Sequence, residues 1–307
     1  TALIVGFEKT LTPEVLAHGH VDVVPADDDM FEPELRDGCL HGRGTADMKA
    51  GVACLMTLMQ RLRSQKPDVA LMLTTDEETG GFDGAKHMVE ERGLRPSFAI
   101  SAEPSTGDRY MDIVTEQKGV ARATIKSHGR SAHASRPWKG ENAADQLIHL
   151  YTEDIKPMFP DANSETWNTT VNLGRMESGD AANKVPEEAA MHLDIRWTQQ
   201  LPASEVKNRL EGIEQLELES WFNDPMLNTD AENRYIQILE RSCHESGFDA
   251  GTTRKNAASD MRHFSAVDIP AVVFGPEGYG PHEPTEHAVV GSMEDYISAL
   301  ERFVERL

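Results

Sequence analysis

Residues 15–22 read Val15-Leu16-Ala17-His18-Gly19-His20-Val21-Asp22, an apolar run followed directly by histidine and aspartate, residue types that bind metal ions. The apolar residues predict a short strand. Similar strand-like runs occur at residues 69–75, 98–101 and 271–274. Helix-like patterns lie between these runs, and strands that alternate with helices form a largely parallel sheet with both faces covered. The sequence therefore predicts an α/β fold.

The clearest helical pattern follows the first strand. Val52, Leu55, Met56 and Met59 occupy the i, i+3, i+4 and i+7 positions of an amphipathic helix, which we expect to start near Ala46. Further helices are expected at residues 84–91, after Asn228 and from Met293 onward.

The middle of the chain has a different pattern. Its expected order is a strand at 119–127, a helix at 142–151, extended chain at 166–176, a strand at 190–197, a helix at 202–212 and a strand at 216–221. Apolar and polar residues alternate along 190–197, which indicates a sheet with one exposed face. The order β-α-β-β-α-β is typical of a ferredoxin-like motif. We therefore predict a discontinuous domain, residues 1–117 and 229–307, that is interrupted by an inserted α+β domain, residues 118–228.

The composition narrows the class of protein. The chain has 307 residues, 39% of them hydrophobic, with 52 acidic residues against 30 basic ones and a formal net charge of −22. A surface this acidic repels phosphate backbones and anionic lipids, so we expect neither a nucleic-acid nor a membrane partner. No stretch approaches the roughly eighteen apolar residues of a membrane-spanning helix, and the three cysteines have no paired spacing. These features predict a cytoplasmic globular protein.

Candidate metal ligands follow four of the expected strands. They are His20 with Asp22, the acids Asp76-Glu77-Glu78, Glu103, and His282 beyond Gly275-Pro276, and Asp47 in the glycine-containing run 42–47 is a fifth candidate. Ligand sites in open α/β sheets gather at the carboxyl ends of the strands. Two histidines and several carboxylates that converge there would repel one another without cations. This mixture of nitrogen and oxygen donors suits zinc, with manganese or cobalt as alternatives.

Each of these features alone has a simpler explanation. A His-x-Asp pair is often structural, and adjacent acids such as Glu77-Glu78 usually form a solvated turn. Asp47 at the start of a helix would serve as an N-cap. Their joint placement at one edge of the sheet favours the metal site.

Four motifs together carry a resemblance to a known family. They are HGHVDVVP at 18–25, GRGTADMK at 42–49, DEE at 76–78 and SAEP at 101–104. In this order they resemble the M20 metallopeptidase family, which includes acetylornithine deacetylases, succinyl-diaminopimelate desuccinylases, aminoacylases and carboxypeptidases. The similarity covers essentially the whole chain. It implies a zinc-peptidase catalytic domain with an inserted domain that acts as a lid and in dimerisation.

The resemblance also implies roles for individual residues. Asp47 would bridge two Zn²⁺ ions, with His20 and Glu103 completing one site and Glu78 and His282 the other. Glu77 would be the general base, and Asp22 would orient His20. Paired metal ions lower the pKa of a shared water molecule and polarise the scissile carbonyl group.

The inserted domain has candidates of its own. The run 129–135 resembles the family segment whose histidine reaches the active site of the partner subunit, so His133 would stabilise an oxyanion there and the enzyme would be a homodimer joined through the inserted domain. Without the resemblance, such a loop histidine is an ordinary surface residue. Asn183 matches a position that helps to bind the oxyanion or the substrate. Arg196 would either clamp a substrate carboxylate in a bidentate manner or form a cross-strand ion pair.

One motif departs from the family pattern. The family usually has a glycine-rich turn before the last strand, whereas residues 257–262 read Ala-Ala-Ser-Asp-Met-Arg here. Ser259 and Arg262 remain candidate substrate contacts, but the glycines are replaced.

These features lead to a prediction of function. Glu103 and the run HEPTE at 282–286 look closest to the acetylornithine deacetylase and succinyl-diaminopimelate desuccinylase branch. We therefore predict a dinuclear zinc amidohydrolase of amino-acid biosynthesis, which removes an N-acyl group from a small amino-acid substrate. The alternatives are a metallo-dipeptidase or carboxypeptidase that cleaves a peptide bond, and a non-catalytic metal-binding homologue. The presence of Glu77, which has no structural duty, argues against the last.

Overall fold

The computed structural model describes residues 1–107, 109–159, 166–214 and 216–307. The chain divides into two compact units. Unit 1 comprises Thr1–Gln117 and Leu227–Leu307, and unit 2 comprises Lys118–Met226. Unit 2 therefore ends at Met226, two residues before residue 228, where the sequence pattern ended the inserted domain.

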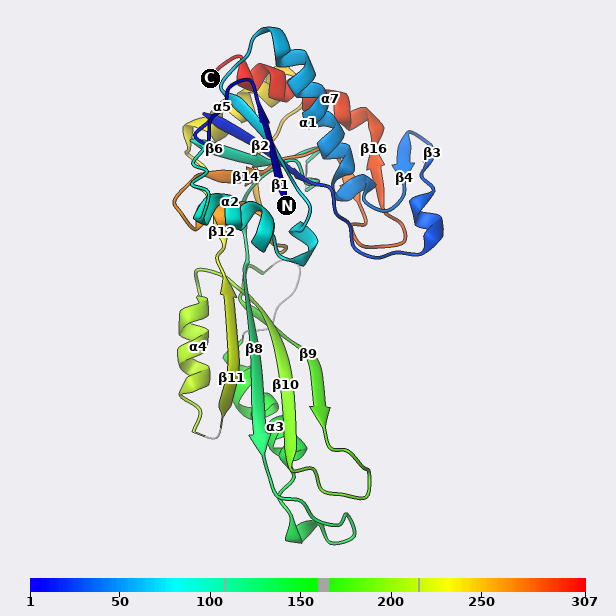
Figure 1. Cartoon of the computed structure of the whole chain (residues 1–307), viewed down its shortest axis with the longest axis vertical. Helices are drawn as coiled ribbons and strands as arrows, with labels where there is room; N and C mark the ends of the chain where they lie inside the picture. Colours follow the sequence, from blue (N-terminus) through cyan, green and yellow to red (C-terminus); the bar gives the residue numbers. More distant parts are fainter. Residues whose placement is uncertain (108, 160–165, 215) are drawn as a thin grey trace. The chain divides into compact units, whose positions relative to one another are not determined.

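Unit 1 is built on an eight-stranded sheet (Figure 1). Its order is β1 (Ala2–Gly6), β5 (Val69–Thr74), β2 (Val15–His20), β6 (Phe98–Ser101), β14 (Ala271–Val273), β7 (Ile113–Gln117) and β12 (Leu227–Asn228), with β13 (Thr252–Lys255) also paired to β7. The central strands β5, β2, β6 and β14 run parallel to one another. The mostly parallel α/β sheet predicted from the sequence is confirmed.

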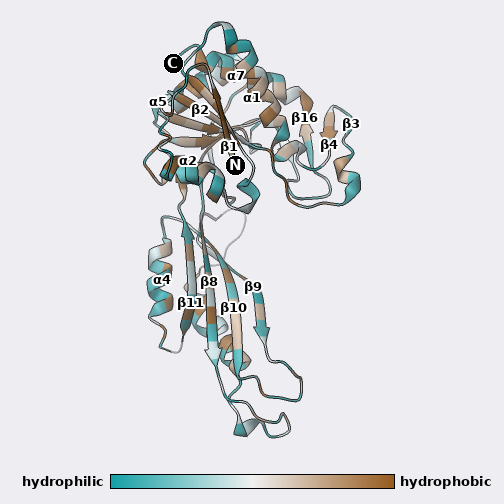
Figure 2. Cartoon of the chain, in the orientation of Figure 1, coloured by the Kyte–Doolittle hydropathy of each residue, from teal (hydrophilic) through white to brown (hydrophobic). Residues whose placement is uncertain are grey.

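Helices cover both faces of this sheet. The longest, α1 (Ala50–Arg61), α5 (Arg234–Glu245) and α7 (Val290–Val304), share one core with Val15 and Ala17 of β2. The shorter α2 (His87–Glu90) and α6 (Met261–Ser265) share a second core with Leu16. Successive residues of a strand point to opposite faces, and all six residues of β2 are buried, so neither face of β2 is exposed. Figure 2 shows hydrophobic colour in the strands of this sheet.

The start of α1 differs from the prediction. The helix begins at Ala50 rather than near Ala46, because residues 45–49 form an irregular turn in which Asp47 has non-helical backbone angles, φ −116° and ψ 92°. Lys49 is the residue that precedes α1, so Asp47 is not its N-cap. The beginning of α1 also packs closely on the sheet, since a Cβ atom on Gly51 would lie 2.1 Å from the carbonyl oxygen of Ala102.

Other helix boundaries also differ slightly. The last helix begins at Val290, three residues before the expected Met293. The expected helix at 84–91 is a π-type turn followed by the single turn of α2. The short 3₁₀ and π segments are Asp28–Phe31, Thr45–Lys49, Leu62–Ser64, Glu77–Thr79, Phe82–Lys86, Pro137–Lys139, Tyr151–Ile155 and Lys156–Met158.

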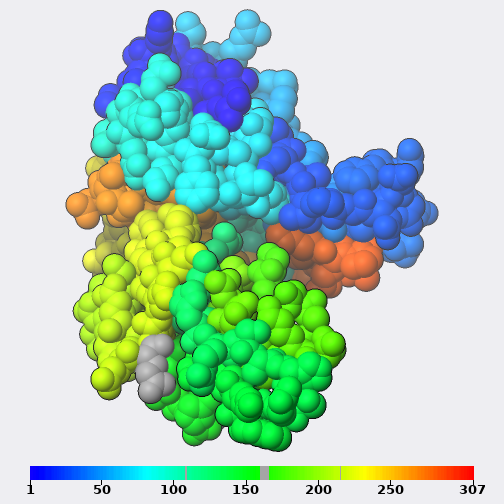
Figure 3. All heavy atoms as spheres, turned by 60° about the horizontal axis from the view of Figure 1, so that its bottom comes forward, coloured from blue at the N-terminus to red at the C-terminus, as the bar shows by residue number. Residues whose placement is uncertain are grey.

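A small second sheet in unit 1 was not predicted. It has the order β15 (Gly278–Tyr279), β16 (His287–Val289), β4 (Cys39–His41) and β3 (Glu34–Arg36). In Figure 3 the blue segment that contains β3 and β4 lies against the orange-red segment that contains β16. The sheet therefore joins two segments that are far apart in the sequence and that each lead into a candidate metal ligand.

Unit 2 contains one antiparallel sheet with two helices. In chain order its elements are β8 (Gly119–His128), α3 (Ala143–Leu150), β9 (Thr170–Ser178), β10 (Glu188–Trp197), α4 (Ala203–Glu211) and β11 (Glu217–Asp224). The strands lie in the order β11-β8-β10-β9 and share one core with both helices. This element order is the β-α-β-β-α-β pattern expected for the middle of the chain. Among the described residues, no helix of either unit is long and apolar enough to cross a membrane.

Candidate metal centre

The carboxyl ends of neighbouring parallel strands meet at one edge of the large sheet. His20 is the last residue of β2 and lies opposite Thr74, the last residue of β5. Ser101 ends β6 on the other side of β2 and leads into Glu103. This register brings side chains from three separate segments together at the carboxyl ends of the strands. Ligand sites in open α/β sheets form at that edge.

His20, Asp47 and Glu78 form the centre of this cluster. One potential ligand atom from each of the three lies within 4.8 Å of the others. The Nε2 atom of His20 is 3.0 Å from Oδ1 of Asp47. On the other side, Nε2 of His282 is 3.6 Å from Oδ2 of Asp47 and 3.1 Å from Oε2 of Glu78. The two oxygens of Asp47 therefore face different histidines.

Asp22 contacts two members of the cluster. Its Oδ1 atom is 3.5 Å from Nδ1 of His20, and its carbonyl oxygen is 3.1 Å from the same nitrogen. Its Oδ2 atom accepts a hydrogen bond of 3.0 Å from the backbone N–H of Glu78. With Nδ1 of His20 turned toward Asp22, the other ring nitrogen, Nε2, is directed at Asp47 and can serve as a metal ligand.

The acidic cluster strongly favours bound positive charge. Burial alone would lower the pKa of His20, but hydrogen bonds to Asp22 and Asp47 and the negative charge of Glu77 raise it to about 12. Burial and the charge of Asp47 raise the pKa of Glu103 to about 8. The same two causes raise the pKa of Glu78. The negative charge of the carboxylates raises these pKa values. A divalent cation would neutralise the same negative charge.

Glu77 is partly buried next to these ligand candidates. Its burial and the charges of Glu103 and Asp260 raise its pKa well above the usual range for a glutamate. A carboxyl group with a raised pKa next to a metal-type donor set is suited to hold and release a proton. The donor set of histidine nitrogens and carboxylate oxygens fits a divalent metal such as zinc.

Sequence reasoning missed a buried polar chain behind the ligand candidates. His18 lies with Nε2 3.3 Å from Oδ2 of Asp260 and Nδ1 3.4 Å from Oγ of Ser101. Ser101 in turn donates a hydrogen bond of 3.2 Å to Oε1 of Glu103. The only sequence signal was the position of His18 two residues before His20, which places both on the same side of β2.

Ser259 and Arg262 are buried in unit 1. The Ser259 hydroxyl donates to Oε1 of Gln117 at 2.5 Å. Arg262 donates to the carbonyl oxygens of Ser259 and Gly80, both at 2.8 Å. The contact with Gly80 anchors the loop that carries Glu77 and Glu78, so both side chains make internal contacts in this structure.

The remaining candidates lie in unit 2. His133 is exposed, with Nδ1 2.9 Å from the Ser135 hydroxyl, and the carbonyl oxygen of Asn183 accepts a bond of 2.9 Å from the N–H of Ala134. These two candidates therefore sit on adjacent segments. The Arg196 guanidinium contacts both carboxylate oxygens of Asp194, at 2.6 and 3.3 Å. The ion pair considered from the sequence is thus present, but it forms along β10 rather than across strands.

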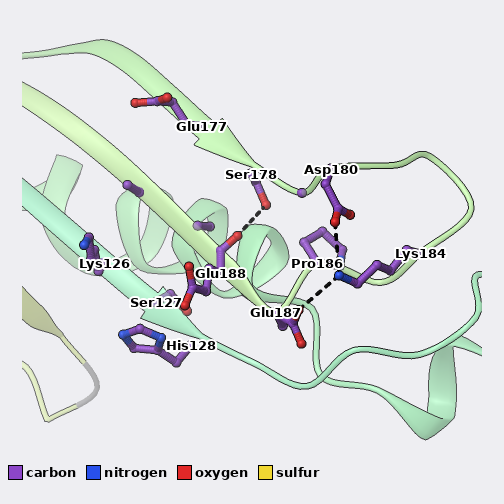
Figure 4. Close-up of a pocket in the computed structure, with 13 residues that line it drawn as sticks. Lys126, Ser127, His128, Glu177, Ser178, Asp180, Lys184, Pro186, Glu187 and Glu188 are labelled. Carbon is purple, nitrogen blue, oxygen red and sulfur yellow. Dashed lines mark hydrogen bonds and ion pairs between the residues drawn. The ribbon is translucent and has the colours of Figure 1, made fainter.

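Unit 2 also contains a pocket of about 520 Å³, shown in Figure 4. Several of its charged residues are already paired. Lys184 contacts Asp180 at 3.3 Å and Glu187 at 3.0 Å, the contacts dashed in Figure 4. His128, which also lines the pocket, is 3.0 Å from Glu217. These pairs leave the strand-end cluster of unit 1 as the better candidate for catalysis.

Comparisons with known proteins show the family of this chain. A model of the peptidase family M20/M25/M40 matches residues 16–306. A succinyl-diaminopimelate desuccinylase from Delftia acidovorans is 27% identical to this chain, over 96% of the chain and 82% of its own length. A second, from Alkalilimnicola ehrlichii, is 25% identical over 94% of the chain and 82% of its own length.

Solved structures show the same fold. A tripeptidase from Staphylococcus aureus matches with a TM-score of 0.81 at 21% identity, covering 99% of this chain and 83% of that one. An M20 family metallo-carboxypeptidase from Sulfolobus solfataricus matches with a TM-score of 0.75 at 15% identity, covering 99% and 86%. The family resemblance predicted from the four motifs is confirmed. The chain belongs to peptidase family M20/M25/M40 and is a hydrolase that acts on amide bonds.

Proposed function

We propose that this protein is a dinuclear zinc amidohydrolase that removes the acyl group from an N-acyl amino acid, as a succinyl-diaminopimelate desuccinylase does. One observation carries the dinuclear part of the proposal. The two carboxylate oxygens of Asp47 face different histidines, His20 on one side and His282 on the other. A carboxylate in that position is suited to bridge two cations. Cobalt or manganese would fit the same donors.

Each metal position has a further ligand candidate in this proposal. Glu78, 3.1 Å from His282, completes the second position. Glu103 completes the first position. The charge of Asp47 raises the pKa of Glu103 and the charge of His20 lowers it, so both residues lie near its carboxyl group. When bound, the two ions would lower the pKa of water and polarise the scissile carbonyl group.

Glu77 is the proposed general base. Its carboxylate would accept a proton from the attacking water and deliver it to the nitrogen of the leaving amine. The raised pKa of this carboxyl group supports such a role, because a raised pKa helps a carboxylate to take up a proton. Asp22 would keep His20 oriented through the contacts with its Nδ1 atom.

The relatives support the choice of substrate class. The two curated relatives are both named succinyl-diaminopimelate desuccinylase. We therefore place this enzyme in the N-acyl amino acid branch, with a small-molecule substrate and a role in cytoplasmic amino-acid biosynthesis. Arg196, Ser259 and Arg262 are proposed substrate contacts. To bind a substrate carboxylate, Arg196 would have to give up its hydrogen bonds to Asp194.

We also propose that unit 2 joins two copies of the chain and acts as a lid. His133 would then reach the metal centre of the partner copy and, with Asn183, stabilise the oxyanion of the transition state. The adjacent positions of the two residues in unit 2 support a shared role.

The function is tested by amine release from zinc-loaded protein. We expect chelator-sensitive cleavage of succinyl-diaminopimelate or another N-acyl amino acid, and a loss of about 10²–10⁴-fold in kcat for Glu77→Gln, because general acid–base catalysis contributes that much. Zinc content should be unchanged in this variant. Glu283→Gln, an exposed acid beside His282, serves as the matched control and should keep its activity. Cleavage of dipeptides alone would contradict the acyl specificity, and full activity with chelator would contradict the metal mechanism.

The role of His133 is tested by complementation between two inactive variants. His133→Ala and Glu77→Gln chains, carrying different tags, are produced together and mixed dimers are purified. If His133 acts in the partner's site, one of the two sites in a mixed dimer contains both native residues, so activity should return toward half of the wild-type value. Mixed dimers that remain as inactive as the parent variants would overturn the action in trans.

The raised pKa values predict how stability depends on pH. Glu103 has a pKa of about 8 in the folded protein against 4.5 as a free group, so the folded state holds a proton that the unfolded chain releases. The metal-free protein should therefore lose stability through this group as the pH rises from about 4.5 to about 8. Zinc should raise the melting temperature more near pH 8 than near pH 5, because it competes with protons for the same donors. Thermal unfolding with and without zinc measures both effects.

The control for this experiment is substitution of the titrating group. Glu103→Gln should flatten the pH dependence of the metal-free protein, whereas Glu283→Gln should leave it unchanged. Equal slopes in wild type and Glu103→Gln would show that another group governs the dependence.

A further inference from the structure

A buried ion pair lies directly behind the loop that carries Asp47. Nη1 of Arg43 contacts Oε2 of Glu286, and the two side chains are only 4% and 1% exposed. The residues are 243 positions apart in the sequence. Burying a pair of charges costs desolvation energy, which the attraction between them and further hydrogen bonds can offset. Its partners therefore indicate what it does.

Glu286 binds the backbone of Asp47 itself. Its Oε1 atom accepts hydrogen bonds of 3.1 Å from the N–H groups of both Ala46 and Asp47. Its own carbonyl oxygen accepts a further bond of 3.1 Å from the N–H of Gly42. One residue thus holds both ends of the 42–47 loop, and the carboxylate fixes the amide group from which the Asp47 side chain projects.

The loop needs such a partner because its backbone is not helical. Asp47 and Met48 have non-helical angles, so this turn differs from a regular helix start. Charge-assisted hydrogen bonds from a carboxylate to backbone N–H groups are stronger than neutral ones. The Arg43 guanidinium compensates the charge of that carboxylate on its other side.

Glu286 also belongs to the segment that carries His282. Residues 280–286 form a compact loop, with bonds from the N–H of Glu283 to the carbonyl oxygen of Gly280 and from the N–H of Glu286 to that of Glu283. The segment before this loop also packs closely on the loop that carries Asp47, since a Cβ atom on Gly278 would lie 2.7 Å from the Cβ atom of Ala46. The Glu286 side chain therefore connects the loops of two candidate ligands, Asp47 and His282.

We propose that Glu286, supported by Arg43, is a positioning residue that sets the distance between Asp47 and His282 and thereby the metal affinity of the position they share. The inference rests on the metal site of the proposed function and adds residues that hold its ligands from behind. Residues that orient metal ligands from behind commonly change metal affinity about 10–100-fold when they are substituted.

The first test is Glu286→Gln, which keeps the size of the side chain and removes its charge. Metal-free protein is titrated with Co²⁺, and binding is followed by visible absorption in competition with a chelator of known affinity. We expect the weaker of two binding steps to lose about 10–100-fold in affinity. Glu283→Gln, three residues earlier on the same loop and exposed, should bind as the wild type does. Circular dichroism confirms that each variant is folded.

A double variant separates positioning from general stability. In Arg43→Met with Glu286→Gln neither charge remains buried, so a purely structural effect of an unpaired Arg43 should disappear. Our inference expects Co²⁺ affinity to stay low in this double variant even where its melting temperature recovers. Recovery of affinity together with stability would overturn the inference, as would wild-type affinity in Glu286→Gln.

The same titration distinguishes the two proposals. If the wild-type protein binds fewer than two Co²⁺ ions per chain, the proposed dinuclear function fails. If the wild type binds two ions and both Glu286 variants do so with unchanged affinity, only the positioning role fails.

Discussion

The structure of unit 1 depends on one electrostatic constraint: several carboxylates and two histidines converge at one edge of a parallel sheet. The charge of Asp47 raises the pKa of both Glu78 and Glu103, so the three carboxyl groups lie close together. Hydrogen bonds to Asp22 and Asp47 and the negative charge of Glu77 raise the pKa of His20 to about 12, so the cluster favours positive charge. Such a cluster weakens the folded state unless positive charge is bound. Metal binding and stability of the catalytic unit are therefore two aspects of the same arrangement.

The parallel sheet makes this convergence possible. Strands β5, β2 and β6 are neighbours and end together, so each contributes a loop to the same edge. Their apolar residues are buried on both faces, which leaves the strand ends as the place where polar groups can accumulate. Asp47 and His282 come from outside these three strands. The buried Arg43–Glu286 pair and the small sheet hold their loops next to the ligand candidates at the strand ends.

Local patterns explain how much could be predicted. The meeting of the ligand candidates at the strand ends was predictable because each follows an apolar run. Alternation along 190–197 correctly indicated a strand with one polar face. The start of α1 was not predictable, because an apolar residue such as Met48 can be buried in an irregular turn as well as in a helix, and the sequence pattern is the same in both cases. The small sheet escaped prediction because its strands have only two or three residues. Arg43 and Glu286 meet only through tertiary folding, so neither periodicity nor spacing links them.

In the proposed function Asp47 bridges two metal ions, which can be seen in a crystal structure of the zinc-loaded protein with anomalous scattering at the zinc edge. We expect two zinc peaks about 3.5–4 Å apart, one bound by His20 and Glu103, the other by Glu78 and His282, with one oxygen of Asp47 on each. A single zinc ion at full occupancy, or two ions without Asp47 between them, would contradict it.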